Sequence, residues 1–173
     1  MIITVEKLKE QVDCGTATDA LIAAKLEAIE AVIRAYTNNN FQQRAVRFGG
    51  WSEDMVVYGS PAFIEVGDTV EISQSGVNDG LYSVTAVGED FMEVDKPLNK
   101  THYNLVTRIN YPADVVQCAV DLFKWKQTMG DKVGVKSETL SRHSVTYEDS
   151  ATLFMGYPVG ILNGLKLHKK ARC

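Results

Sequence analysis

The stretch from Tyr111 to Cys173 constrains the fold most, because a strongly apolar helix is followed there by a polar hairpin and a basic tail. Pro112 suits the first helical position, where its missing N–H needs no partner. Two adjacent rows of the helix, at spacings of three and four, are largely apolar. They are Val115, Cys118, Leu122, Trp125 and Met129, and Val116, Ala119, Val120, Phe123 and Gln127. This apolar arc is wider than one core contact requires. We therefore expect the helix to pack on two sides, either wholly within its domain or partly against another subunit.

The composition is typical of an ordinary soluble protein. The chain has 173 residues, of which 45% are hydrophobic and 23% are charged, which predicts one domain, or one domain with a smaller insert. The formal net charge of -4 excludes a surface that is cationic overall and binds nucleic acid. The sequence shows no signal peptide and no apolar run of about 18 residues, so we expect a cytosolic protein without a membrane span.

Cysteine usage favours a reducing compartment. Cys14, Cys118 and Cys173 are odd in number and far apart, which fits neither a disulfide framework nor a zinc site. Cys118 lies within the apolar face of its helix, so we interpret it as a small buried hydrophobic residue.

The first 43 residues predict two helices. Thr4 is a suitable N-cap for a short helix through about Val12. The second helix, from Asp19 to about Thr37, has apolar residues at helical spacing and ends at three consecutive asparagines.

Residues 44–110 change in character, because short β-branched and aromatic runs alternate there with turn residues. The expected strands are Ala45–Phe48, Val56–Tyr58, Ala62–Val66, Thr69–Gln74, Leu81–Val87, Phe91–Val94 and Leu105–Ile109. Closely spaced strands with many turns indicate a small antiparallel β barrel or sandwich. We therefore predict an α+β fold, in which residues 1–43 and 111–173 form a core of three to four helices and 44–110 are an inserted β domain. Residues 137–147 alternate polar and β-branched types, which predicts a two-stranded ribbon or one extended arm.

No catalytic constellation is found in the sequence. His102, His143 and His168 have no Cys, Asp or Glu at ligand spacing, and the glycine-rich segments lack the lysine of a phosphate loop. We therefore expect no enzyme activity, no metal site and no cofactor. The basic tail needs explanation: it is either a frayed solubilising end or an arm that docks on an acidic surface or on nucleic acid.

Short motifs and their order point to a family. Helices are expected to open at Thr4-Val5-Glu6, Thr18-Asp19-Ala20 and Pro112-Ala113-Asp114. Then come a ribbon, Glu138 to Tyr147, a break at Gly156-Tyr157-Pro158 and a basic end. This order resembles the head–tail connector (adaptor) family of tailed phages and prophages. The resemblance covers about residues 1–42 and 111–173, and the insert departs from the shortest members.

The resemblance implies a structural virion protein, made in the bacterial host cytoplasm and located at the virion neck. Members form a ring, usually of twelve subunits, under the portal, where the ring extends the DNA channel and presents a platform for the stopper or tail. Double-stranded DNA would pass without sequence-specific binding, which suits an acidic protein.

Three groups of residues follow from this resemblance and from the sequence pattern. The expected subunit interface is Val115, Cys118, Leu122, Trp125 and Met129. The expected portal-docking tail is Leu165, Lys166, His168, Lys169, Lys170 and Arg172. The expected channel or seam loop includes Glu138, Arg142, His143 and Tyr147.

Two alternatives remain open. One is a stopper or tail-completion protein of the same neck, although a helical frame favours the adaptor. The other is a nucleic-acid-binding module built on the small barrel, for which Phe63, Tyr82, Phe91 and Tyr103 would supply stacking surfaces. In the insert, however, acidic residues outnumber basic ones.

Overall fold

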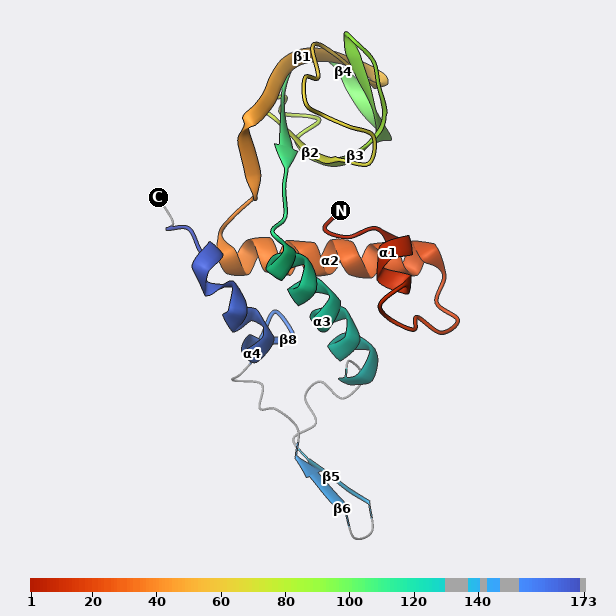
Figure 1. Cartoon of the computed structure of the whole chain (residues 1–173), viewed down its shortest axis with the longest axis vertical. Helices are drawn as coiled ribbons and strands as arrows, with labels where there is room; N and C mark the ends of the chain where they lie inside the picture. Colours follow the sequence, from red (N-terminus) through yellow and green to blue (C-terminus); the bar gives the residue numbers. More distant parts are fainter. Residues whose placement is uncertain (130–136, 141–142, 147–152, 172–173) are drawn as a thin grey trace. The chain divides into compact units, whose positions relative to one another are not determined.

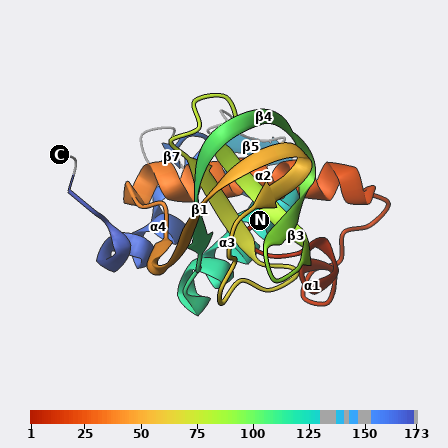
Figure 2. The same ribbon diagram turned by 90° about the horizontal axis from the view of Figure 1, so that it is seen from above.

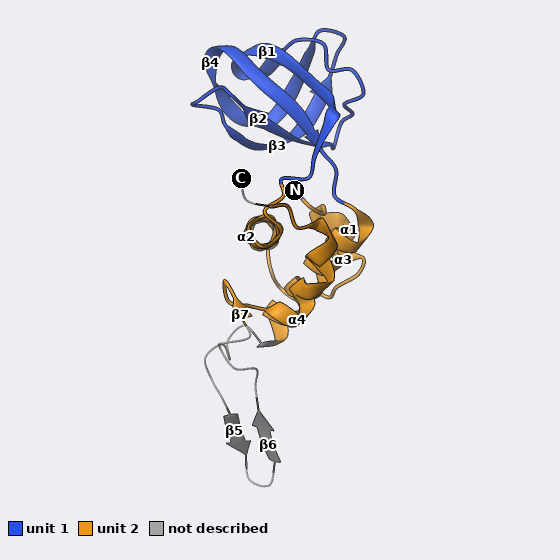
Figure 3. Cartoon of the chain, turned by 90° about the vertical axis from the view of Figure 1, so that its left-hand side faces the viewer, with its two compact units in different colours: residues 1, 40–111 blue, residues 2–39, 112–173 orange. Residues whose placement is uncertain are grey.

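A computed structural model describes residues 1–129, 137–140, 143–146 and 153–171. The protein is a mixed α+β chain that divides into two compact units (Figure 3). Unit 1 comprises Met1 and residues 40–111, and unit 2 comprises residues 2–39 and 112–173. The chain has 22 acidic and 18 basic residues. Unit 1 contains ten of the acidic and five of the basic residues, so unit 2 contains twelve acidic and thirteen basic residues. The acidic balance of the chain is therefore a property of the inserted β unit.

Unit 2 begins with two capped helices. The Thr4 hydroxyl accepts a hydrogen bond from the Lys7 amide at the start of α1 (Val5–Lys9), and Thr18 caps α2 (Asp19–Thr37) in the same way. Asn38, with φ of 49°, ends α2 in the left-handed conformation. The bounds of the long helix match the sequence prediction. The short helix was expected to reach about Val12 but ends at Lys9, because the chain continues there as a turn.

Helix α3 (Ala113–Met129) lies at the centre of unit 2. It packs against α2, against the C-terminal helices α4 (Val159–Leu162) and η3 (Asn163–His168), and against β8 (Tyr157–Pro158) (Figure 1). Both apolar rows find partners in this way: Val115 and Leu122 are buried, and so are Ala119, Val120 and Phe123. The wide apolar face is therefore explained by packing within the chain.

Two short antiparallel pairs complete the described part of unit 2. Strand β5 (Ser137–Leu140) pairs with β6 (His143–Thr146), so the expected ribbon is two-stranded. Strand β7 (Leu153–Phe154) pairs with β8 across a tight turn at Met155 and Gly156, both of which have positive φ.

Unit 1 is a four-stranded antiparallel sheet of β1 (Gln42–Tyr58), β2 (Thr69–Ser73), β3 (Gly80–Val87) and β4 (Phe91–Ile109). The strand order is β1-β4-β2-β3, and the first part of β4 also pairs with β3. Figure 2 shows β1 and β4 as long, strongly curved ribbons. The antiparallel sheet is confirmed, but no closed barrel is found among the described residues.

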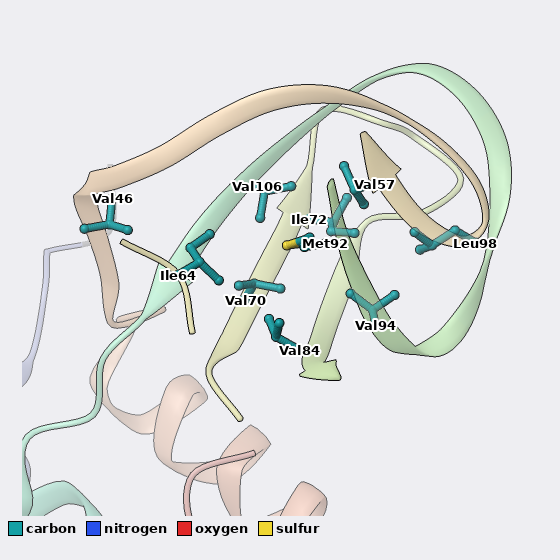
Figure 4. Close-up of a cluster of buried hydrophobic side chains, with 10 residues drawn as sticks. All are labelled: Val46, Val57, Ile64, Val70, Ile72, Val84, Met92, Val94, Leu98 and Val106. Atoms are coloured by element: carbon teal, nitrogen blue, oxygen red, sulfur yellow. The ribbon is translucent and has the colours of Figure 1, made fainter. Parts of the chain in front are cut away.

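An apolar cluster forms most of the core of unit 1 and lies inside this curved sheet (Figure 4). Its buried members are Val46, Val57, Ile64, Val70, Ile72, Val84, Met92, Val94, Leu98 and Val106. Every strand contributes at least one of them, so the sheet is stabilised mainly by apolar burial between its own strands.

Five of the predicted strands need correction. The separate strands expected at Ala45–Phe48 and Val56–Tyr58 belong to one strand, β1, and those at Phe91–Val94 and Leu105–Ile109 belong to β4. The intervening polar residues remain paired through bulges, with register shifts between Gly50 and Val56. The strand expected at Ala62–Val66 is wrong. That segment is a turn in which Phe63 has φ of +64° and the Ile64 amide donates to the Pro61 carbonyl.

Candidate functional site

The C-terminal segment, residues 163–171, is held against the end of α2. The Lys170 amide donates to the Thr37 carbonyl at 2.8 Å, and the Asn39 amide group donates to the His168 carbonyl at 3.1 Å. Asn38 donates in the same manner to the Lys170 and Ala171 carbonyls, at 3.3 and 3.1 Å. The backbone of this segment is therefore positioned by the asparagines that terminate the helix.

Side-chain contacts add to this attachment. The Lys169 ammonium lies 3.7 Å from the centroid of the Tyr36 ring, a cation–π distance. The Tyr36 hydroxyl is 3.1 Å from Asn163 Oδ1, and its ring meets Phe154 edge-on. A shallow cavity of about 340 Å³ lies beside these groups.

The ring of His168 pairs with Asp114 in the first turn of α3, with His168 Nε2 2.6 Å from Asp114 Oδ2. This hydrogen bond is the largest cause that lowers the pKa of the Asp114 carboxyl. The pair joins the C-terminal segment to α3, as the asparagines join it to α2.

What this segment presents to solvent is one apolar and several cationic side chains. Leu167 is 93% exposed, and its neighbour Lys166 is exposed as well. Lys169 and Lys170 are also exposed although they are attached. Because the backbone beneath them is already ordered, a partner that binds here would lose little conformational entropy of this segment.

The expected docking residues thus have different environments. Leu165 is 1% exposed and belongs to the core of unit 2, so its side chain does not lie on the surface. Lys166, His168, Lys169 and Lys170 lie on the segment, and Arg172 lies outside the described residues. Leu167 was not among the expected docking residues, because nothing in the sequence distinguishes its exposure from the burial of Leu165.

The residues expected at a subunit interface are mostly core residues of this chain. Val115, Cys118 and Leu122 are buried, and Trp125 is half-buried with its ring 6.1 Å from that of Tyr157. Cys118 is 6% exposed, which confirms its interpretation as a small buried residue, and burial raises the pKa of its thiol to about 11. The side chain of Met129 lies outside the described residues.

The expected channel loop is described only in part. Glu138 is paired with Val145 and His143 with Leu140 in the β5–β6 ribbon. Arg142 and Tyr147 lie outside the described residues.

A second candidate site lies in unit 1, where aromatic rings surround an open pocket of about 570 Å³. Trp51 stacks on Tyr58 with the ring centroids 4.0 Å apart and the planes at 11°. Tyr103, His102 and Asp90 complete the rim. Trp51 and Tyr103 are 43% and 49% exposed, so aromatic surface faces the solvent.

Three glycines are among the residues that line this aromatic pocket. A Cβ added to Gly49 would lie 2.9 Å from the Tyr103 ring, and one added to Gly50 would lie 2.2 Å from the Tyr58 carbonyl oxygen. Gly59, the third glycine of the pocket, is fixed by its amide, which donates to the Asp90 carbonyl at 2.9 Å. The Tyr103 ring can therefore lie close to the backbone at Gly49, and the two parts of the bent strand can approach each other at Gly50, because neither position carries a side chain.

Comparison with known proteins does not identify either site. No protein-family model matches the chain, and no curated protein matches it either. Among the described residues, no group of three or more His, Cys, Asp or Glu side chains is placed to hold a metal ion. In the same part of the chain, no helix combines the length and apolarity needed to cross a membrane.

Proposed function

We propose that the protein is a head–tail connector (adaptor) subunit of a tailed phage or prophage, which forms a ring under the portal. The observation that carries this proposal is the arrangement of unit 2. A short helix, a long helix and a packing helix are followed by a ribbon, a turn at Met155-Gly156 and a basic C-terminal segment, in the order of the resemblance. The ring would extend the DNA channel and support the stopper or tail.

In this proposal the C-terminal segment docks on the portal. Leu167 is an exposed apolar anchor, and Lys166 beside it supplies a cation for an acidic partner surface. Interfaces obtain most of their affinity from a few such anchors on ordered backbone. Lys169, His168 and Lys170 then act chiefly by holding the segment in place.

The ribbon and the insert take secondary roles. The β5–β6 ribbon, with Glu138 and His143, would lie towards the channel or the seam between subunits. Unit 1, a small barrel-like sheet inserted in the helical connector core, would thicken the ring from outside or contact a neighbouring ring. Its ten acidic and five basic residues suit a surface that does not hold DNA phosphates.

The test measures the mass of the purified protein with and without the portal protein of the same phage genome. Light scattering gives the stoichiometry, and negative-stain images show whether rings form. We expect rings on the portal, and Leu167→Asp and Lys166→Glu should each weaken their assembly at least several-fold. Leu21→Asp is the matched control, because Leu21 is 49% exposed at the other end of α2.

Two outcomes would contradict the proposal. A chain that stays monomeric with the portal but binds DNA at moderate salt would instead be a nucleic-acid-binding module. A chain that ignores the portal but binds an assembled connector ring would be a stopper or tail-completion protein of the same neck.

A further inference from the structure

The aromatic pocket of unit 1 has a geometry that the proposed ring assembly does not explain. Opposite Trp51, the ladder between β1 and β4 passes from Gly50↔Asn104 to Ser52↔Thr101. Two residues of β4, His102 and Tyr103, therefore lie opposite one residue of β1, Trp51. This arrangement is a β-bulge in β4. Bulges of this kind redirect side chains and are frequent beside binding sites.

The second side of the pocket comes from the far end of the same strand. Strand β1 bends between Gly50 and Val56, where Asp54 has φ of +56°, and this bend places Tyr58 on Trp51. Asp90 joins Tyr58 at the rim, because it immediately precedes Phe91, the ladder partner of Tyr58. Three aromatic residues, Trp51, Tyr58 and Tyr103, and the acidic residue Asp90 thus line one open space.

The side chains of four rim residues have no polar partner among the described residues. Within the described part of the chain, no hydrogen bond or ion pair involves the side chains of Trp51, Tyr103, His102 or Asp90. The nearby buried cluster differs sharply: the Asn78 amide group donates to Ser52 Oγ and to the Asn99 carbonyl, and its oxygen accepts the Asn99 amide. The strands are thus tied together by Asn78, whereas the rim of the pocket is left open to a ligand.

The charges of the pocket and of unit 1 indicate which kind of ligand can bind. Among the described residues, no lysine or arginine lines the pocket, whereas Asp90 does, and acidic residues outnumber basic ones by ten to five in the unit. Aromatic faces attract cations, and a planar guanidinium can stack on a ring while it pairs with a carboxylate. A phosphate backbone would be repelled by the same charges.

We propose that this pocket binds an arginine side chain presented by an extended segment of a partner protein. The guanidinium stacks against Trp51, the best cation–π ring of the pocket, and pairs with the Asp90 carboxylate. This inference does not depend on the connector role, because it concerns unit 1 alone.

The test uses the full chain and fluorescein-labelled peptides Gly-Ser-Arg-Ser-Gly, with citrulline or lysine in place of arginine in two control peptides. Citrulline has nearly the shape of arginine but no charge. Fluorescence anisotropy should show that the arginine peptide binds about 2- to 30-fold more tightly than the citrulline peptide. It should also bind more tightly than the lysine peptide, because only the guanidinium is planar.

Matched variants separate the pocket from the general charge of the unit. Asp90→Asn should weaken the arginine peptide several-fold. Glu65→Gln, which changes the net charge equally at an exposed position outside the pocket, should leave binding unchanged. Trp51→Leu should abolish the preference for arginine, whereas Phe63→Leu, at an 80% exposed aromatic residue elsewhere in unit 1, should not.

Three results would overturn the inference. Equal binding of the arginine and citrulline peptides would show that the positive charge does not contribute to binding. Equal binding of the arginine and lysine peptides would show that the pocket does not recognise the planar guanidinium. Equal losses of affinity for the arginine peptide in Asp90→Asn and Glu65→Gln would show that only the net charge of the unit matters. Tighter binding of labelled oligothymidine, lost in Trp51→Leu, would assign the pocket to single-stranded nucleic acid instead.

Discussion

At the scale of single residues, two adjacent glycines of β1 make different demands on the fold. The atom nearest to an added Cβ at Gly50 is the Tyr58 carbonyl oxygen at 2.2 Å, which is backbone and paired into the bent strand. At Gly49 the nearest atom belongs to the Tyr103 ring at 2.9 Å. A side chain on the rim can rotate away, whereas a strand cannot.

Gly50→Ala is therefore expected to destabilise unit 1 by roughly 1–3 kcal/mol, the usual cost of overpacking, and Gly49→Ala by clearly less. The chain has two tryptophans, Trp51 in unit 1 and Trp125 in unit 2. In a Trp125→Phe background, urea unfolding followed by Trp51 fluorescence reports on unit 1. Equal stability of the two alanine variants would contradict the close approach of Gly50 to Tyr58.

At the scale of elements, the C-terminal segment depends on α2 and α3 together. The link to α3 is the pair of His168 and Asp114, which lowers the pKa of Asp114 below its ordinary value of 3.8. A carboxyl whose pKa is lower in the folded state stabilises the fold above the pKa of the unfolded state. That stabilisation is lost as the pH falls through the folded value.

Acidification below about pH 4 should therefore loosen the C-terminal segment. At neutral pH, Asp114→Asn and His168→Gln should have a similar effect. Asp114 is 56% exposed, so the effect is small, below about 1 kcal/mol. Faster hydrogen exchange at the Lys170 amide, which bonds to Thr37, is the measurement. Asp121→Asn, on the same helix but bonded to Gln117, is the control. Unchanged exchange in both variants would contradict the role of the pair.

The same scale shows how far sequence reasoning reaches. The bounds of α2 were predictable, because its caps and its apolar spacing are local signals. The continuity of β1 was not, because Gly49-Gly50 and Glu53-Asp54 are typical of turns, and only pairing with β4 keeps them in a strand. The attachment of residues 168–171 to the end of α2 could not be predicted from the sequence either. Asn38 and Asn39 were interpreted as a helix end, and their bonds to carbonyls about 130 residues away leave no trace in the pattern.

The candidate sites follow the same division. The basic residues of the C-terminal segment could be recognised in the sequence as a charge cluster. The exposure of Leu167 could be determined only from the structure. The aromatic pocket joins residues from two places in β1 with His102 and Tyr103 of β4 and with Asp90, which precedes β4, and a bend and a bulge bring them together. A signal was available in the Gly-Gly-Trp run, because paired glycines inside a strand often mark a bulge or a close approach.

At the scale of the whole molecule, the β unit is an insertion whose two ends lie side by side. Gln42 pairs with Ile109, the Asn110 amide donates to the Phe41 carbonyl at 3.0 Å, and the rings of Phe41 and Tyr111 are 5.0 Å apart. Each unit has its own apolar core, and the apolar core of unit 1 is complete without unit 2. Insertions with adjacent ends are tolerated because their host needs only a short connection.

Replacement of residues 40–111 by a short Gly-Ser linker should therefore leave unit 2 folded. We expect a helical circular dichroism spectrum and a cooperative Trp125 transition with a midpoint close to that of the whole chain. Residues 40–111 alone should fold as well, with a cooperative Trp51 transition. Loss of cooperative unfolding in the shortened chain would show that the helical unit depends on the insert.

The shortened chain also tests the role proposed for the insert. If unit 1 thickens the ring from outside, the chain without it should still assemble on the portal, because the C-terminal segment and its supports on α2 and α3 all lie in unit 2. Light scattering of the mixture gives the stoichiometry, and the Leu167→Asp variant of the shortened chain is the negative control. If a folded, shortened chain no longer bound the portal, the docking surface would include unit 1, and the peripheral role would be wrong.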